Sequence, residues 1–415
     1  MEFIDEIKYR EEIYEVSLRN GSIEINNARN NIQGQRIIND NNILVIVSSS
    51  SDPEYCKQYM SWARGISKKI KVQERIKWFH KEYYKGSVTI GSDDGIEPLI
   101  DLVKHAYKEL LDKGLKSEVI GVFKKIHREH KIIIDNGEAI EDRILYELYI
   151  YPYTIYYGRL LSSSKLIGDN NIEGLYNKLD KALDDIYREI MLKSRSKRLN
   201  PAYTGKWYVI LTKESAPVIY HEIIHLLQGD EPIKLPIGYR FEADITIIED
   251  PFYRGPLQRL FDDEVYPAWK RTLVEKGLVI DYLHTRTTVY EGARPGNARG
   301  LFTRSKPLHY QLIIKPGDWS IEEMIIESRR SIIVESIAEA HIHNRYIRVI
   351  PEICLVSKRD RVEPVALGEI LIPIEKLNQI FIGTSKSIFS RYTFEKRFEV
   401  YEEAPATLVY GRVLV

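Results

Sequence analysis

Apolar and polar positions alternate near the start of the chain in a way that predicts strands. Residues 12–18 and 22–26 alternate on either side of Asn20-Gly21, a dipeptide that favours a two-residue hairpin turn. A second pair of short apolar runs lies within residues 35–47 and flanks a polar turn. The pattern predicts that the chain opens with two hairpins of an antiparallel sheet.

Helical periodicity interrupts the strand pattern three times in the first half of the chain. Apolar residues recur at helical spacing in residues 53–69, 97–113 and 172–193. Between the second and third of these segments, residues 119–166 return to strand-like patterns. This half therefore predicts an N-terminal α/β domain with an antiparallel or mixed sheet and helices.

A basic run, Lys193–Arg198, separates this half from a second half of different character. We place a domain boundary there, which gives an N-terminal domain at residues 1–195 and a C-terminal domain at residues 196–415. Most of the second half consists of short strands punctuated by turn residues, and residues 239–250 are a clear example. The predicted fold class is α+β, with a β-rich, barrel-like C-terminal domain that carries the active-site helix.

The segment Tyr220–Asp230 is where the residue types and spacing of a metal-dependent hydrolase coincide. On a helix, His221 and His225 lie on one face, because positions four apart are neighbours. Two imidazoles can then hold one Zn²⁺ ion, while Glu222 can act as general base on the metal-bound water. The motif predicts His221 and His225 as metal ligands and Glu222 as the catalytic residue.

The alternative for this motif is a purely structural role. With ten histidines in 415 residues, His-Glu-x-x-His arises by accident in roughly a few per cent of chains of this composition. The context favours metal binding, because residues 207–211 predict a strand, Ser215 and Pro217 predict a helix start, and Gly229 predicts its end. The two histidines are therefore expected on a short, mostly apolar helix.

The amino-acid composition limits which binding partners and which cellular compartment we expect. Sixty basic and sixty acidic residues give a formal net charge of zero, so the total charge offers no support for binding nucleic acid or an anionic membrane. Cys56 and Cys354 are the only cysteines, which argues against a disulfide framework and fits a reducing compartment. The charged start lacks a secretory signal, and no run reaches the roughly 18 apolar residues that a membrane span needs. We expect a cytoplasmic protein.

Several short segments occur in the order in which they occur in a known family. Together with the histidine motif, they make the chain resemble the TldD/PmbA metallopeptidases over nearly its whole length. The segments are Leu18–Glu24, Tyr220–Asp230, Phe241–Asp250, Phe261–Glu264, Leu273–Gly277, Gly296–Arg299 and Ile314–Gly317. Several weak motifs in one order are stronger support than one sharp motif.

The resemblance implies a zinc-dependent peptidase, that is, a peptide-bond hydrolase. Family members form a dimer that encloses the active site and admits peptides and unfolded segments. They bind the peptide as an added strand, which suits a β-rich domain because main-chain pairing recognises a backbone with little regard to sequence. The expected partners are a peptide or unfolded protein substrate and a second subunit, either a second copy or a related chain.

Two departures from the family pattern concern the metal. The family usually has three residues between the Glu and the second His, whereas this chain has two, Ile223 and Ile224. The family's third ligand is a Cys near the C-terminus, and the matching stretch, Tyr392–Arg397, contains no Cys. Cys354 lies about forty residues earlier, in a stretch where the resemblance implies a strand, and we interpret it as a core residue.

Other residues are candidates for the third ligand. Glu242 and Asp244 follow the second His at a distance similar to that of the carboxylate ligand of other His-Glu-x-x-His peptidases. His341 and His343 alternate on a predicted strand, so both point to one face and could complete a site of three imidazoles. The structural alternative is an exposed polar strand face for His341 and His343, and a strand residue facing solvent for Glu242. Cys354 also stays a candidate.

A second function is also consistent with the resemblance. The family includes subunits without the metal site that serve as the non-catalytic half of a heterodimer, and the altered spacing and missing Cys fit such a subunit. Retention of His221, Glu222 and His225 argues against it. A third possibility is a metal-binding scaffold without hydrolysis. The physiological substrate, the cleavage preference and the choice between homodimer and heterodimer do not follow from the sequence.

Overall fold

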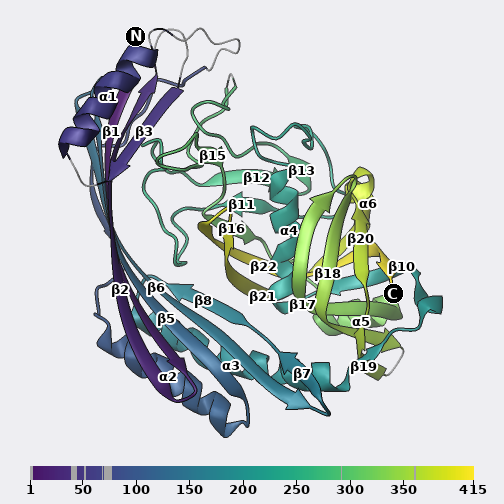
Figure 1. Ribbon diagram of the computed structural model, residues 1–415. Coiled ribbons are helices and arrows are strands. Elements are labelled where there is room, and N and C mark those ends of the chain that lie inside the picture. The colour runs from purple at the N-terminus through teal and green to yellow at the C-terminus, as the bar shows by residue number, and fades with distance from the viewer. Residues whose placement is uncertain are drawn as a thin grey trace.

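Two large β-sheets, joined by a long helix, organise the chain (Figure 1). The computed structural model describes residues 3–38, 44–50, 53–67, 69, 77–290, 292–358 and 361–415. The first sheet has eight strands in the order β3-β2-β1-β5-β6-β4, with β7 and β8 also paired to β6. Its strands are β1 (Phe3–Arg19), β2 (Ser22–Ile38), β3 (Leu44–Ser50), β4 (Gly86–Ile90), β5 (Lys116–Ile132), β6 (Gly137–Tyr156), β7 (Arg159–Ser162) and β8 (Lys165–Asp169).

The opening hairpins form where the sequence predicted them. Asn20 and Gly21 have φ of 51° and 77°, as a two-residue turn of the hairpin type requires, and Arg19 pairs with Ser22. The strands of this hairpin run further than predicted, because β1 also pairs with β5 along most of its length. The second hairpin is confirmed by the pairing of β2 with β3, while its predicted turn lies outside the described residues.

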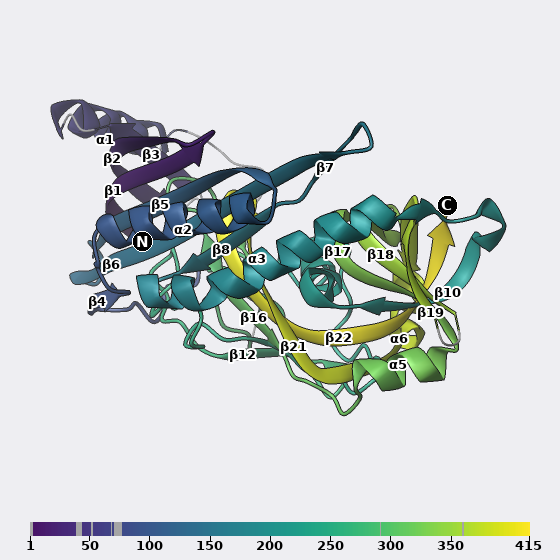
Figure 2. The ribbon, with the colours of Figure 1, turned by 90° about the horizontal axis from the view of Figure 1, so that it is seen from below.

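Helices α2 (Glu97–Asp112) and α3 (Ile172–Arg195) lie side by side against one face of the first sheet (Figures 1 and 2). Their apolar residues, among them Leu102 and Leu179, join Phe123 of the sheet in one buried core. The side chain of Asn171 caps α3 by accepting a hydrogen bond from the Gly174 N–H at 2.7 Å. Helix α1 (Pro53–Ser67) lies near β2 and β3.

The second sheet has twelve strands, of which five close into a barrel. β22 pairs with β10 and β20, β10 with β17, β17 with β18, and β18 with β20. The strands of this half, including the small β14–β15 sheet, are β9 (Lys197–Arg198), β10 (Gly205–Leu211), β11 (Ile247–Glu249), β12 (Arg271–Glu275), β13 (Leu278–Val279), β14 (Ala298–Arg299), β15 (Lys306–Pro307), β16 (Gln311–Ile314), β17 (Arg330–His343), β18 (Tyr346–Lys358), β19 (Arg361–Ala366), β20 (Glu369–Pro373), β21 (Phe381–Glu395) and β22 (Phe398–Leu414).

Three helices accompany this sheet: α4 (Ala216–His225), α5 (Ile321–Ser328) and α6 (Leu377–Ile380). Helix α4 lies in the middle of this half of the molecule, and its apolar residues belong to the same buried core as those of β10, β17 and β22 (Figure 1). The predicted α+β class, with a β-rich, barrel-containing C-terminal part that carries this helix, is therefore confirmed. The domain boundary after residue 195 stays a prediction.

The strand predicted at residues 239–250 was wrong for most of its length. Only Ile247–Glu249 forms a strand, because the backbone before it pairs with the turn between β12 and β13 and with helix α6. The N–H of Phe241 donates to Gly277 O and that of Glu242 donates to Asn378 O. Hydrogen bonds to a turn and to a helix satisfy this backbone without strand geometry, so period-two patterning alone misleads here.

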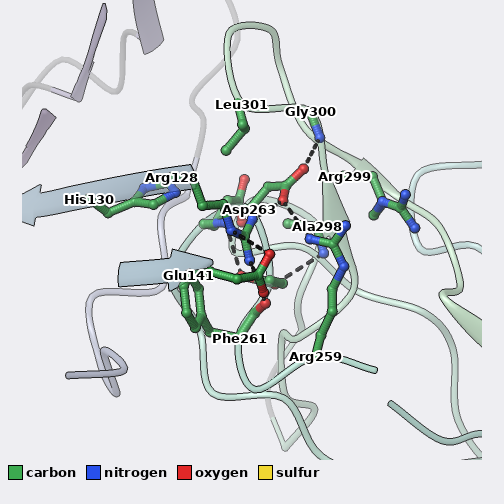
Figure 3. A network of polar contacts seen from close by, with 12 residues as sticks. Arg128, His130, Glu141, Arg259, Phe261, Asp263, Ala298, Arg299, Gly300 and Leu301 are labelled. Carbon is green, nitrogen blue, oxygen red and sulfur yellow. Dashed lines mark hydrogen bonds and ion pairs between the residues drawn. The ribbon is translucent and has the colours of Figure 1, made fainter. Parts of the chain in front are cut away.

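Buried charges fasten the loops of the second half to the first sheet. The Arg128 side chain of β5 points at the Asp263 carboxylate, with 2.5 Å between Nη1 and Oδ1 (Figure 3). Asp263 also accepts the Gly300 N–H at 2.7 Å, and Arg128 lies 3.2 Å from Glu141 of β6. We call this group the interface cluster.

In the described part of the chain, no helix is long and apolar enough to cross a membrane.

Candidate metal centre

A pocket of about 820 Å³ opens beside helix α4. One wall comes from α4, with His221, Glu222 and His225. The other walls include residues 337–342 of β17 and residues 391–395 of β21. The predicted motif residues therefore all line one pocket.

Helix α4 is held at its start and at its middle. The Ser215 hydroxyl accepts the Thr212 N–H at 2.9 Å, lies 2.6 Å from Val334 O, and so ties the helix start to β17. The Tyr220 hydroxyl lies 2.9 Å from the Thr407 hydroxyl of β22. Residues 216–224 are buried, which explains why the helix is apolar nearly all round. The rigid helix fixes the two histidine rings, whose centroids lie 5.0 Å apart.

Glu395, the last residue of β21, completes a group that could hold a metal. Its Oε2 lies 3.4 Å from His221 Nε2, and its Oε1 lies 3.9 Å from His225 Nε2. One ligand atom from each of the three residues lies within 4.8 Å of the others. Two imidazoles and one carboxylate are an established zinc sphere, and the adjoining pocket leaves a coordination position open. The donor set and the open side therefore fit a catalytic zinc ion.

Glu402 of β22 orients His221 from behind. Its Oε1 lies 2.5 Å from His221 Nδ1 and 3.1 Å from His309 Nε2, and Arg391 donates to its Oε2 at 2.7–2.9 Å. The Glu402 side chain is fully buried, so these contacts must satisfy it. A carboxylate that accepts from Nδ1–H leaves Nε2 as the metal-facing nitrogen, which is the usual arrangement behind a metal-bound histidine.

The charges of the centre are strongly coupled. Burial opposes charging of His221, but Glu402 and Glu395 outweigh it and raise the pKa of His221 to about 9. Burial and the neighbouring charge of His221 lower the pKa of His225 to about 4. Burial raises the pKa of Glu395, but both histidines outweigh it and lower that pKa to about 2. Metal binding must therefore displace a proton from His221, since a ligating imidazole nitrogen carries none.

Glu222 lines the same pocket without a polar partner. Its side chain is buried, and no hydrogen bond or ion pair holds its carboxylate within the described ranges. Burial raises the pKa of Glu222, and nearby His221 and Arg391 oppose that rise. A carboxylate with a raised pKa in a pocket is suited to accept and return a proton near neutral pH.

The structure brings none of the five proposed third ligands into this group. Glu242 and Asp244 are exposed in an irregular segment outside the pocket. His341 lines the pocket, and exposed His343 does not, but neither belongs to the group of ligand atoms. Cys354 is a core residue of β18 whose thiol contacts Val365 O at 2.9 Å, and burial raises its pKa to about 12.

Sequence reasoning missed Glu395, Glu402 and His309. Glu395 lies in Tyr392–Arg397, the stretch that matches the family's ligand-bearing segment, where the resemblance implies a Cys and this chain offers a carboxylate. For Glu402 a signal existed, because it is an acidic residue within the largely apolar run of β22. No local pattern identifies His309, which meets the other residues only through the fold.

Comparisons with known proteins agree with the fold and the family resemblance. Residues 204–365 match the family model of the PmbA/TldA metallopeptidase C-terminal domain. A metalloprotease of Methanocaldococcus jannaschii is 27% identical over 345 residues, which cover 77% of this chain and 75% of that protein. A metalloprotease of Methanothermobacter thermautotrophicus is 28% identical over 146 residues, 32% of each chain.

Solved structures with the same fold cover the whole chain. The structure of TldE from Thermococcus kodakarensis has a TM-score of 0.77 at 17% identity and covers 100% of this chain and 96% of that one. A protein from Thermotoga maritima, described as a modulator of DNA gyrase, has a TM-score of 0.79 at 16% identity and the same coverage. At such low identity these likenesses establish the fold alone.

Proposed function

The chain belongs to the TldD/PmbA family, and from this premise we propose that it is a zinc-dependent peptidase with its active site beside α4. The observation that carries the proposal is the group formed by His221, His225 and Glu395 at the wall of an open pocket. Glu222 lies in the same pocket and supplies the base that hydrolysis needs.

Each residue has a distinct role in this proposal. Zinc, when bound by His221, His225 and Glu395, lowers the pKa of a water molecule and polarises the peptide carbonyl. Glu222 takes the proton of that water and returns it to the departing amine. Glu402 keeps the proton on Nδ1 of His221, so that Nε2 faces the pocket. The walls of the pocket exclude part of the solvent from these charges.

An open strand edge supports a peptide or an unfolded segment as the substrate. β17 pairs with β10 only up to Val334, and beyond that residue it pairs with β18 on one side. Its other edge, at residues 337–342, lines the pocket. An extended peptide can pair with such an edge through its main chain, which gives affinity without a strict sequence requirement.

We also propose that the protein works as a dimer, with a second copy or a related subunit. The hairpin of β6 and β7 extends away from the body of the molecule (Figure 2) and exposes Ile155, Tyr157 and Leu160 by 74%, 89% and 69%. A cluster of exposed large apolar side chains is uncommon on a monomer and marks an interaction surface. Size-exclusion chromatography with light scattering would measure the oligomeric state. A monomer at all protein concentrations, alone and with a related subunit, would contradict the proposed dimer.

The proposed compartment is the cytoplasm. The chain has two cysteines, and Cys354 is a buried core residue with its thiol hydrogen-bonded to the backbone. Such a chain needs no oxidising environment for its fold. Fractionation of cells that express a tagged protein would test the assignment.

The experiment for the function separates metal binding from catalysis. Mass spectrometry of protein purified without chelator should find about one zinc per chain, and His225→Ala and Glu395→Ala should each lose it. Cleavage of an unstructured peptide mixture should fall on the order of a hundredfold or more in Glu222→Gln, which lacks the base. Metal-free wild type without cleavage would favour the non-catalytic subunit, and zinc without cleavage would favour the scaffold.

A further inference from the structure

The turn between β21 and β22 places two cations in an unfavourable backbone conformation. Lys396 and Arg397 have φ of 48° and 75°, and the strands close around them with Glu395 paired to Phe398. In the described chain, three other turns have two successive residues with positive φ, and all three have glycine second. They are Asn20-Gly21, Tyr157-Gly158 and Lys276-Gly277. Glycine is favoured there because it lacks a Cβ.

The turn without glycine, Lys396-Arg397, lies at the metal centre. Residues held in such a conformation persist where the surroundings fix them, and they cluster at functional sites. Here Lys124 Nζ contacts Glu399 at 3.1 Å, and the Arg299 guanidinium lies 4.9 Å from the centre of the Phe398 ring. Both contacts hold the strand that follows the turn, so the turn has a fixed position.

Lys396 is the cation of this turn that lines the pocket. Its Nζ lies 3.6 Å from Glu395 Oε1, the oxygen that faces His225, and its side chain is 46% exposed. The other cationic side chain that lines the pocket, Arg391, is already engaged by Glu402. Within the described residues, Glu395 is the only carboxylate that pairs with Lys396.

We propose that Lys396 anchors a carboxylate of the peptide substrate, either the free C-terminus or an acidic side chain. The proposal rests on the function above, because a metal ion that takes the Glu395 carboxylate leaves Lys396 without its pairing partner. An ammonium beside a partly enclosed pocket then attracts an anion. Glu231 and Glu339 also line the pocket. Their charges disfavour a substrate carboxylate near them, so Lys396 selects both the group and its position.

Binding to a variant that cannot turn over tests this role. Fluorescein-labelled short peptides would be titrated into Glu222→Gln protein with and without added zinc, and anisotropy would give the affinity. Three otherwise neutral peptides are needed: one with a free C-terminus, one amidated, and one amidated with a single internal Glu. Lys396→Asn removes the charge and keeps a residue that tolerates positive φ.

We expect Lys396→Asn to weaken binding of a carboxylate-bearing peptide by about tenfold and to leave the amidated neutral peptide unchanged. A loss for the free C-terminus identifies the terminal carboxylate, and a loss for the Glu peptide identifies the side chain. Arg397→Gly removes the neighbouring cation and serves as the matched control, which should bind all three as the Glu222→Gln parent does.

Several results would overturn the proposal. Equal effects of Lys396→Asn on all three peptides, no effect on any, or no measurable binding by the parent protein would each do so. Lys396→Arg should restore the preference, because it returns the charge. Zinc content and cleavage by the wild type are measured separately. Failure of the proposed peptidase function would appear in those two measurements, whereas failure of the proposed anchor would appear only in the binding of the peptides.

Discussion

Two buried clusters of charged side chains in this chain are built in different ways. In the interface cluster, each carboxylate meets arginine: Glu141 contacts Arg128 and Arg143, and Asp263 contacts Arg128 and Arg259. In the metal centre, by contrast, Glu222 has no pairing partner within the described ranges, and Glu395 faces His225 at 3.9 Å. In the first cluster both carboxylates are paired with arginine without any ligand, whereas the second has ligand atoms directed at an open pocket. Both clusters are buried and charged. A candidate site differs from a structural cluster in having groups without a pairing partner and an open pocket through which a ligand can reach them.

The largest effect should come from breaking the interface cluster. Asp263→Asn removes the charge that Arg128 and Arg259 contact and leaves Glu141 as the one charged partner of Arg128 within the described residues. Loss of one partner of a buried pair costs about 3–5 kcal/mol. Denaturant unfolding monitored by circular dichroism would measure the free energy of unfolding. Asp142→Asn is the control, because Asp142 pairs with His127 at 2.7 Å in a half-exposed position. We expect that change to cost less than about 1 kcal/mol. Similar losses in both variants would contradict the comparison.

Removing the proposed base should have the next largest effect, and on catalysis alone. Glu222→Gln should lower kcat by on the order of a hundredfold or more, about 2.7 kcal/mol. Because no partner loses its contact in the described structure, the free energy of unfolding and the zinc content should stay near those of the wild type. Single-turnover cleavage of a peptide and a zinc measurement on the same sample test this. A wild-type rate in the variant would exclude Glu222 as the base.

Glu402 lies between the two kinds of cluster, because it is fully paired yet acts on the metal centre. Glu402→Gln keeps the volume but weakens the support of His221, and loss of such a support costs about 10–100-fold in metal affinity. Competition with a fluorescent chelator would measure the zinc affinity. The pH dependence of that affinity should also change, because Glu402 raises the pKa of His221. An unchanged affinity and pH profile would leave Glu402 with a structural role only.

The smallest predicted effect is a gain in stability. Arg397→Gly relieves a side chain at φ 75° and should raise the free energy of unfolding by about 1 kcal/mol, since left-handed conformations cost non-glycine residues roughly that much. Thermal unfolding would detect the gain. Tyr157, at φ 48° in the first position of its turn, offers a matched comparison through Tyr157→Asn. A loss of stability in Arg397→Gly would show that the Arg397 side chain makes contacts that outweigh the strain.

The sequence predicted those features that local physics determines. The Asn20-Gly21 turn follows from the conformations open to two adjacent residues, and α4 follows from its start signals and the spacing of His221 and His225. Glu395 and Glu402 could not be located in this way, because their positions depend on the pairing of β21 with β22 and on its register against α4. The strand prediction for the segment before β11 failed for the same reason, since this backbone pairs with Gly277 in a turn and with Asn378 of α6.

One hairpin, β21–β22, supplies both the proposed third ligand, Glu395, and the carboxylate behind His221, Glu402. This has a consequence during protein synthesis. A growing chain contains His221, Glu222 and His225 long before the ribosome adds Glu395 and Glu402, which follow His225 by 170 and 177 residues. Domains fold as they emerge, so the helix can form while its metal partners do not yet exist. The nascent protein therefore cannot assemble the complete group until translation has passed Glu402. Under the proposed function, this order keeps the growing chain from cleaving its own unfolded segments or those of neighbouring chains before the group is complete.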